Sequence, residues 1–362
     1  MTTNHSLDFE NNYQGRRVLI TGHSGFTGGW LSSWLIKLGA KVFGLSLAPN
    51  TSPALFNVLG LGERMTSVFG NINERETVAR IMRETQPEIV FHLAAQPIVS
   101  VGFRDPIDTF LTNVIGTLHV LEKARMCEAT QGVVCITTDK VYNNKEWVWG
   151  YREGDELGGK DPYSASKACA ELVAACYQQT MAGRGNGVAI ATARGGNIIG
   201  GGDWAENRIV PDFVRSLVSD KSLVLRNPAA TRPWQHVLAL VHGYLLLGDS
   251  LLEVPGATKS AWNFGPLASS ERTVQSVVEQ LSKSWRRPQI EYGEGGFPEA
   301  HFLRLDSTRA RTELGWIPAW KFEETVEMTA HWYQAFYDGS NDIYDVTLAQ
   351  INSYRAGLKE TI

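Results

Sequence analysis

The sequence contains no apolar stretch long enough to span a bilayer, and its beginning, MTTNHSLDFENNYQG, is polar. A transmembrane helix needs about 20 consecutive, mainly apolar residues. A secretory signal needs a basic start followed by an apolar run, and neither is seen here. We therefore expect a cytoplasmic protein with no membrane association.

The chain also lacks an excess of basic residues. Its 34 Lys and Arg residues face 38 Asp and Glu residues, and the formal charge is −4. Proteins that bind nucleic acid or an anionic membrane surface usually carry a basic excess. The composition argues against both kinds of partner.

Cysteines are few, and none has the spacing of a metal-binding or redox pair. The four are Cys127, Cys135, Cys169 and Cys176. The last two lie seven residues apart on one predicted helix, a spacing that suits packing better than disulfide pairing. We expect reduced thiols and no metal site.

With 362 residues, the chain is too long for one small core and suits two domains. Up to about residue 195, strand-like and helix-like segments alternate. The expected strands are 17–21, 41–47, 66–70, 88–94, 133–138 and 187–194, and the main expected helices are 74–85, 107–126 and about 161–180. This alternation predicts an α/β fold with a doubly wound parallel Rossmann sheet.

The alternation ends at the glycine-rich segment GGNIIGGGDWAENR, residues 195–208. Short strands mixed with helices follow it, which predicts a smaller C-terminal α/β lobe that binds substrate. We place the dinucleotide-binding domain at 1–195 and the lobe at 196–362. Part of 232–264 is expected to join the first domain.

A glycine motif, TGHSGFTG, connects the first expected strand to the first helix. Gly22, Gly25 and Gly28 permit a tight turn and let backbone N–H groups approach a pyrophosphate at the helix N-terminus. A plain glycine turn is the alternative. Because the motif lies at the first strand-to-helix junction, it predicts a dinucleotide site.

The choice between NAD and NADP depends on the end of the second strand, GLSLAPNTSPALF. A Rossmann site usually has an acid there for the ribose of NAD, or Arg for the 2′-phosphate of NADP. No charged residue occurs between Lys41 and Glu63. The missing cation favours NAD, with Ser46 or the backbone holding the ribose.

The segment YSASK places Tyr163 and Lys167 one helical turn apart, on the same face. A nearby ammonium group lowers the pKa of a phenol, so Tyr163 could exchange a proton with a sugar hydroxyl during hydride transfer. A solvated i,i+4 pair is the alternative. Its position after the fifth strand, behind the glycine motif, favours the catalytic interpretation.

The fifth strand ends in TTDKVY, at the sheet edge where open α/β sheets bind ligands. Thr138 could share the substrate hydroxyl with Tyr163, or it could cap a turn. Asp139 could also cap a turn, or it could act as a general acid. Lys140 is unexpected, because a site that removes a proton from carbon has little use for a cation.

The predicted lobe carries polar residues suited to a nucleotide diphosphate and a sugar. Guanidinium groups bind phosphate oxygens bidentately, and amides bind phosphate or sugar hydroxyls. A surface role is equally reasonable for any one of them, but together they favour a substrate site. They are Asn197, Arg208, Arg226, Arg232 and Asn263.

These motifs together resemble those of the extended short-chain dehydrogenase/reductases that act on nucleotide sugars. Within that group, the chain is similar to the CDP-glucose 4,6-dehydratase family over roughly 17–335. The markers are TGHSGFTGGWL, PEIVFHLAAQP, TTDKVY, EWVWGYRE, DPYSASKACAEL, GNIIGGGDWAENRIVPD and RNPAATRPWQHVL. The glycine and YxxxK motifs are widely shared, whereas TTDK, GGDW and RPWQHV together are much narrower.

The resemblance implies conversion of CDP-D-glucose to CDP-4-dehydro-6-deoxy-D-glucose, on the route to bacterial deoxysugars, with NAD tightly held and returned unchanged. It also implies that Thr138, Tyr163 and Lys167 oxidise the sugar while Asp139 protonates the departing C6 hydroxyl. The implied cofactor-binding residues are Gly22, Gly25, Phe26, Thr27, Gly28, Asn71, Ile72, Leu93, Ala94 and Ala95, with Tyr163 and Lys167. Asn71 stands where relatives have the Asp that grips adenine, which weakens that contact.

The resemblance gives Lys140 a role, because relatives that dehydrate dTDP-glucose carry at this point a glutamate that removes the C5 proton. Lysine can do so only when neutral, and like charge from Lys167 and the nicotinamide ring would favour loss of its proton. The alternative is that Lys140 pairs with Asp139 or Glu146, leaving another group or a water as the base.

Two further functions are compatible with these motifs. A nucleotide-sugar 4-epimerase would use the same Tyr163, Lys167 and cofactor but would need no C5 base. A non-catalytic NAD-binding sensor is disfavoured by the intact Thr138, Tyr163 and Lys167. Relatives commonly form dimers through the YxxxK helix and the helix before strand five, so we expect a homodimer.

Overall fold

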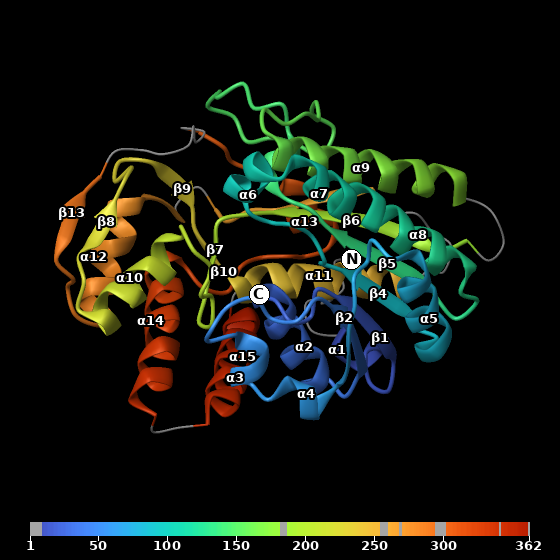
Figure 1. Ribbon diagram of the computed structural model, residues 1–362, viewed down its shortest axis with the longest axis horizontal. Helices are drawn as coiled ribbons and strands as arrows, with labels where there is room; N and C mark the ends of the chain where they lie inside the picture. The colour runs from blue at the N-terminus through green and yellow to red at the C-terminus, as the bar shows by residue number, and fades with distance from the viewer. Residues whose placement is uncertain are drawn as a thin grey trace.

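The computed structural model describes residues 9–181, 187–253, 260–267, 270–293, 302–339 and 342–360. Within these ranges, seven parallel strands form a central sheet in the order β11-β6-β5-β4-β1-β2-β3 (Figure 1). The strands are β1 (Arg17–Thr21), β2 (Lys41–Ser46), β3 (Thr66–Phe69), β4 (Ile89–His92), β5 (Gly132–Ile136), β6 (Ala189–Gly195) and β11 (Ala261–Phe264). The predicted α/β fold with a parallel Rossmann sheet is confirmed.

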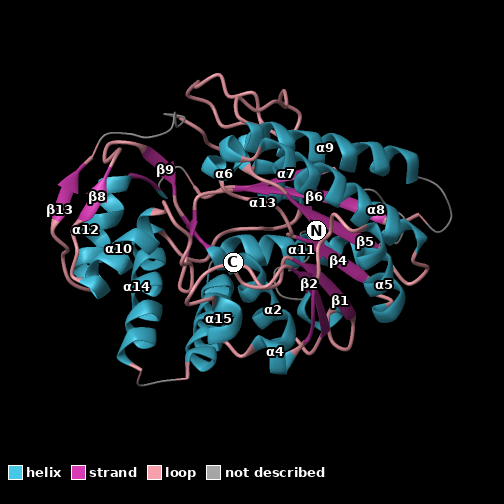
Figure 2. Cartoon of the chain, in the orientation of Figure 1, coloured by secondary structure: helices cyan, strands magenta, loops and turns pink. Residues whose placement is uncertain are grey.

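Both faces of the sheet are buried, because successive strand residues point to opposite sides. In β1, Val18 and Ile20 belong to one hydrophobic cluster, whereas Leu19 belongs to the other. The first cluster lies under α2 (Phe26–Lys37) and α11 (Val237–Glu253), and the second under α5 (Arg75–Thr85), α8 (Thr117–Met126) and α9 (Pro162–Met181). Figure 2 shows helices on both sides of the strands.

The predicted helix at 107–126 contains a π-helical turn. It consists of α7 (Pro106–Phe110), the π-helix η1 (Leu111–Gly116) and α8. The side chain of Asp105 caps α7 by accepting from the N–H of Asp108 at 3.0 Å. π-Turns of this kind are frequent at functional sites, and this one presents Asn113 to the interior.

The second half of the chain builds a smaller lobe of helices and two-residue to three-residue strands, on the left in Figure 1. Its strands are β7 (Ile198–Ile199), β8 (Leu223–Leu225), β9 (Thr231–Pro233), β10 (Gln235–His236), β12 (Glu271–Thr273) and β13 (Ile290–Tyr292). Its helices are α10 (Ile209–Ser219), α12 (Val274–Ser284) and α14 (Phe322–Asp338). The pairs β7–β10, β8–β13 and β9–β12 hold it together.

The chain returns twice from the lobe to the first domain. The segment containing α11 and β11 adds a strand beside β6, with Asn263 opposite Arg194. The last helix, α15 (Ile343–Glu360), packs on α2, where Tyr354 meets the ring of Trp34 edge-on. The return of β11 lies within the predicted segment 232–264, while the domain boundary at 195 stays a prediction.

Shorter helices complete the connections. They are α1 (Phe9–Asn12), α3 (Leu55–Val58), α4 (Leu61–Arg64), α6 (Val99–Arg104), η2 (Asp139–Val141) and α13 (Thr308–Glu313). Over the described ranges, no helix has both the length and the apolar character needed to cross a membrane.

Candidate active site

The glycine loop between β1 and α2 is held against the end of β4. Gly22 has φ +80°, and a Cβ there would lie 2.7 Å from the backbone nitrogen of Ala94. A Cβ on Gly28 would lie 2.2 Å from the carbonyl oxygen of Gly22. A Cβ on Gly25 would meet only that same oxygen, at 3.5 Å, so the loop is open at this position. Two glycines close the turn, and the third faces free space at the N-terminus of α2 (Phe26, Thr27 and onward).

Two of the predicted cofactor-binding segments lie at the same edge of the sheet, where β3 and β4 end. Leu93 and Ala94 bond to Thr21 of β1, through its carbonyl oxygen at 3.0 Å and its hydroxyl at 3.2 Å, and Ala95 follows them. Asn71 follows β3, and its side-chain oxygen accepts from the N–H of Asn73 at 2.9 Å. Ile72 is buried beside it. A dinucleotide lying across these ends would contact both segments.

The end of β2 presents hydroxyl groups. The hydroxyls of Ser24 and Ser46 lie next to each other, and both are within hydrogen-bond distance of the carbonyl oxygen of Leu47, at 2.9 and 2.6 Å. His23 is buried behind them, and burial lowers its pKa to about 4, so the ring is neutral at pH 7. An uncharged edge suits the ribose hydroxyls of NAD and offers no cation for a 2′-phosphate. The site therefore fits NAD.

Tyr163 and Lys167 lie on the face of α9 that covers the ends of β4 and β5, and both are buried. The ammonium of Lys167 donates to the carbonyl of Ile136 at 2.9 Å. Burial lowers the pKa of Lys167 to about 8, and Cys135 and Glu171 act against this shift.

The pKa of Tyr163 is raised to about 12, and burial is the largest cause. Hydrogen bonding by Thr138 and the charge of Arg208 lower it, and Asp139 raises it. The sequence spacing suggested a lowered pKa. Local spacing shows the neighbouring cation but not the desolvation of the phenol, and desolvation is the larger effect here.

Asp139 is held from two directions. One carboxylate oxygen accepts from the Thr138 hydroxyl at 2.9 Å and the other from the Asn197 side-chain amide at 3.1 Å. Gly196 packs directly on the carboxylate, where a Cβ would lie 2.5 Å from its atoms. The turn after β6 thus fixes the orientation of the predicted acid.

Lys140 is exposed, unlike the buried Thr138 and Asp139 before it. Its backbone N–H bonds to the Thr138 hydroxyl at 3.3 Å, which starts η2. Among the residues that the structure describes, its ammonium forms no ion pair with Asp139 or Glu146. The pairing alternative is therefore not seen, and the side chain can turn toward a substrate beside β5.

Two of the predicted substrate ligands lie at this centre. Asn197 bonds to Asp139, and Arg208 forms a 2.9 Å ion pair with Asp203 and lowers the pKa of Tyr163. The charge of Asp203 in turn raises the pKa of Arg208.

Two other predicted ligands, both arginines, lie farther along the lobe. Arg226 is exposed and donates to the side chain of Asn207 at 2.9 Å, next to Arg208 in sequence. Arg232 lies on β9 and donates to the Thr231 carbonyl at 2.9 Å. The exposed guanidinium of Arg226 could also face a diphosphate.

Asn263 is in a different environment from the other four. It is fully buried, its oxygen accepts from the Tyr142 hydroxyl at 2.8 Å, and its nitrogen donates to the carbonyls of Tyr151 and Asp306 at 2.8 and 3.2 Å. These bonds occupy the amide, so the structure gives Asn263 a role in holding β11 against the loop after β5.

Sequence reasoning missed two buried polar residues close to the site. Asn113, in the π-turn, binds the backbone of Gln96 through both amide atoms and donates to the Ser166 hydroxyl at 2.8 Å. Glu171 lies one turn after Lys167 on α9 and bonds to β5 and β6. The spacing of Tyr163, Lys167 and Glu171 was visible, but nothing in it showed that Glu171 is buried.

A family model described as GDP-mannose 4,6 dehydratase matches residues 19–329, which include the glycine loop, TTDK and α9. The chain belongs to this family. A CDP-glucose 4,6-dehydratase from Salmonella typhimurium is 42% identical over 351 residues, covering 95% of this chain and 98% of the relative. The predicted resemblance to nucleotide-sugar 4,6-dehydratases is confirmed.

More distant dehydratases and epimerases share the fold of this family member. A dTDP-glucose 4,6-dehydratase from Xanthomonas campestris is 25% identical over 355 residues, covering 89% of this chain and 96% of the relative. The structure of a dTDP-glucose 4,6-dehydratase from Streptomyces venezuelae, solved with NAD bound, superposes with TM-score 0.77 at 24% identity, over 91% and 100% of the two chains. A UDP-glucose 4-epimerase from Thermotoga maritima gives TM-score 0.76 at 23% identity, over 88% and 99%.

Proposed function

We propose that this dehydratase-family member is an NAD-dependent hydro-lyase that converts CDP-D-glucose to CDP-4-dehydro-6-deoxy-D-glucose. The observation that carries the proposal is the meeting of Thr138 and Asp139 with Tyr163 and Lys167 beside an open glycine loop. The 42% identical Salmonella relative, which bears this activity as its name, supports the choice of substrate.

Bound NAD would supply the hydride acceptor for C4 of the sugar and the hydride donor for C6, so the reaction has no net redox change. The glycine loop would hold its pyrophosphate, and Ser24 or Ser46 its adenosine ribose. Asn71 and Ile72 would line the adenine, and Lys167 would donate to the nicotinamide ribose.

In the oxidation step, Tyr163 accepts the proton of the C4 hydroxyl while Thr138 shares that hydroxyl. A phenol with a pKa near 12 gives up its proton reluctantly. The charge of Arg208 already lowers this pKa, and the ammonium of Lys167 supports the phenolate from one turn away. These two cations therefore stabilise the phenolate form of Tyr163, which is the form that accepts the proton from the bound sugar.

In the elimination step, the new C4 ketone acidifies the proton on C5. Asp139, oriented by Thr138 and Asn197, donates a proton to the departing C6 hydroxyl. Lys140 removes the C5 proton in its neutral form, and afterwards a proton returns to C5. Another group or a bound water is the alternative base.

One assay tests the function as a whole. Purified protein is incubated with CDP-glucose, and the alkaline absorbance of the keto-sugar is followed, with dTDP-glucose and GDP-mannose as controls. We expect keto-sugar from CDP-glucose only, or much more of it from CDP-glucose than from either control sugar. A C4 epimer without keto-sugar would indicate an epimerase, and no turnover of any nucleotide sugar would indicate a binding protein.

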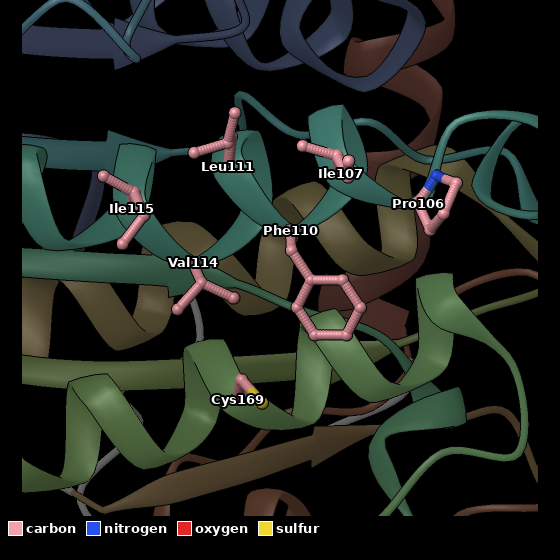
Figure 3. Close-up of a pocket in the computed structure, with 7 residues that line it drawn as sticks. All are labelled: Pro106, Ile107, Phe110, Leu111, Val114, Ile115 and Cys169. Carbon is pink, nitrogen blue, oxygen red and sulfur yellow. The ribbon is translucent and has the colours of Figure 1, made fainter.

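We further propose that two copies form a homodimer through α7, η1 and α9. A groove of about 430 Å³ runs between these helices (Figure 3). It is lined by Pro106, Ile107, Phe110, Leu111, Val114, Ile115 and Cys169. Apolar faces of this size on a helix pair are typical of bundle interfaces, and a second copy would cover the groove with the same helices.

We also propose that the protein acts in the cytoplasm. Its four cysteines, Cys127, Cys135, Cys169 and Cys176, are all free, as expected where thiols stay reduced. Cell fractionation tests this, with recovery in the periplasmic or membrane fraction as the contradicting result.

A further inference from the structure

Glu171 makes three hydrogen bonds through a carboxylate that is almost fully buried. Its Oε1 accepts from the Thr137 hydroxyl at 2.5 Å, and its Oε2 accepts from the Thr192 hydroxyl and the Arg194 guanidinium, both at 2.8 Å. These partners lie at the ends of β5 and β6. Tyr163, Lys167 and Glu171 follow each other at four-residue spacing, so α9 presents them along one face.

The ion pair with Arg194 lets Glu171 stay charged in this interior. Isolated buried carboxylates are strongly disfavoured, whereas a paired and fully hydrogen-bonded one is tolerated. Arg194 also donates to the Tyr142 hydroxyl at 2.7 Å and to the Glu153 carbonyl at 3.0 Å. Burial opposes the charge of this guanidinium, but Glu171 raises its pKa above the ordinary value.

Thr137 connects this pair to the catalytic groups, because Thr138 is the next residue in the chain. Thr137 also bonds through its N–H to the Ala193 carbonyl at 2.8 Å. Without the bond to Glu171, the Thr137 hydroxyl would lose its best-placed acceptor, and the end of β5 would be less firmly tied to α9.

We propose that Glu171 is a positioning residue for the oxidation step: it fixes the catalytic face of α9 against the ends of β5 and β6, and it places a negative charge one turn from Lys167. This inference rests on the proposed function for its kinetic part. Glu171 itself is too buried to touch the substrate.

The charge of Glu171 matters because it opposes the effect of burial on Lys167. Burial lowers the pKa of Lys167 to about 8, and Cys135 and Glu171 oppose that shift. The Cys135 thiol on β5 has a pKa raised to about 12 by burial, and His92 on β4 has a pKa lowered to about 3, so both are neutral at pH 7. Glu171, which is paired with Arg194, is then a group whose negative charge favours the protonated form of Lys167.

The kinetic test follows the reduction of bound NAD by CDP-glucose in a single turnover as a function of pH. In Glu171→Gln we expect the rate to fall about 10-fold to 100-fold. The high-pH limb of the pH–rate profile, where the rate declines as Lys167 loses its proton, should move to a pH about one unit lower. The CDP-glucose dissociation constant should not change. Glu171→Asp, which keeps the charge, should restore the position of the limb but not the full rate.

Tyr142→Phe is the matched control, because it removes a hydroxyl that also bonds to Arg194 in the same buried network but does not touch β5 or Lys167. It should lower the unfolding temperature and leave the limb in place. If Glu171→Gln behaves in the same way, Glu171 is only structural and the proposal is overturned.

A second measurement does not depend on CDP-glucose or on turnover. A buried lysine with a lowered pKa costs stability as pH falls, because the unfolded chain binds the proton more readily. The unfolding temperature of Glu171→Gln should therefore lie below that of wild type, and this gap should be roughly 2 °C wider at pH 6 than at pH 9. A difference that is independent of pH would refute the charge effect even if the proposed function failed.

Thr137→Val provides a second test of the positioning effect if the Glu171 variants do not fold. It removes the bond to Oε1 and leaves the ion pair with Arg194 intact. We expect slower NAD reduction with an unshifted limb, whereas a wild-type rate would refute the positioning effect.

Discussion

Three consecutive residues after β5 differ sharply in environment. Thr138 and Asp139 are buried and bonded to each other, whereas Lys140 is exposed. The short helix η2 produces this change, because its turn directs neighbouring side chains apart. The oxidation and acid groups are thus fixed, while the proposed C5 base is free to move.

Tyr163→Phe should lower the rate at which CDP-glucose reduces bound NAD by at least about 100-fold, because the C4 proton loses its acceptor. The measurement is the absorbance of NADH in a single turnover. Tyr292→Phe, on the exposed β13, serves as a control that should react normally. Near-normal turnover of Tyr163→Phe would end its assignment as the base.

Lys140→Met should separate oxidation from elimination. If Lys140 is the C5 base, the variant still reduces bound NAD with CDP-glucose, but releases no keto-deoxysugar and exchanges no C5 deuterium with solvent. Lys221→Met, an exposed lysine of the lobe, should behave as wild type. Wild-type C5 exchange in Lys140→Met would transfer the role to another group or a water.

At the scale of elements, the junction of β1 and α2 combines two uses of glycine. Gly28 lets the start of α2 pack closely on the loop at Gly22 and His23, and Gly22 adopts positive φ against the end of β4. Gly25 has no close neighbour that would exclude a side chain, so the loop has room for a bound ligand at this position.

This difference predicts opposite effects of two matched substitutions. Gly28→Ala should lower the unfolding temperature, because its methyl group overlaps the Gly22 carbonyl. Gly25→Ala should fold normally but bind NAD about 10-fold or more weakly, measured by quenching of tryptophan fluorescence. Unchanged NAD affinity in a stable Gly25→Ala would place the cofactor elsewhere.

At the scale of the whole molecule, an apolar surface lies on α7, η1 and α9. Ile107 on α7, which lines the groove of Figure 3, is 73% exposed, and Leu172 on α9 is 59% exposed. A second copy is therefore the simplest cover for this face.

Ile107→Glu should convert the dimer to a monomer, because a charge would be buried at the centre of the interface. Light scattering at micromolar concentration measures the mass. Val218→Glu, at an exposed position of α10, is the matched control and should leave the dimer intact. A monomeric wild type would refute the proposed dimer.

The sequence by itself determined the six alternating strands before residue 195, the glycine loop and the Tyr163–Lys167 spacing, because these depend on local periodicity and on positions a few residues apart. It also determined the family, through motifs such as TTDK. The course of β11 could be expected only in outline, since a strand that joins a sheet from 66 residues beyond β6 is selected by tertiary packing.

Only the tertiary structure decided the environments of the polar groups. Asn263 and Arg208 look alike as candidate ligands in the sequence, yet one is enclosed by Tyr142 and two carbonyls and the other lies beside Tyr163. Burial also reversed the expected pKa of Tyr163 and brought Glu171 to the catalytic strand ends. Desolvation and long-range hydrogen bonds depend on residues far apart in the chain, so short-range sequence patterns cannot supply them.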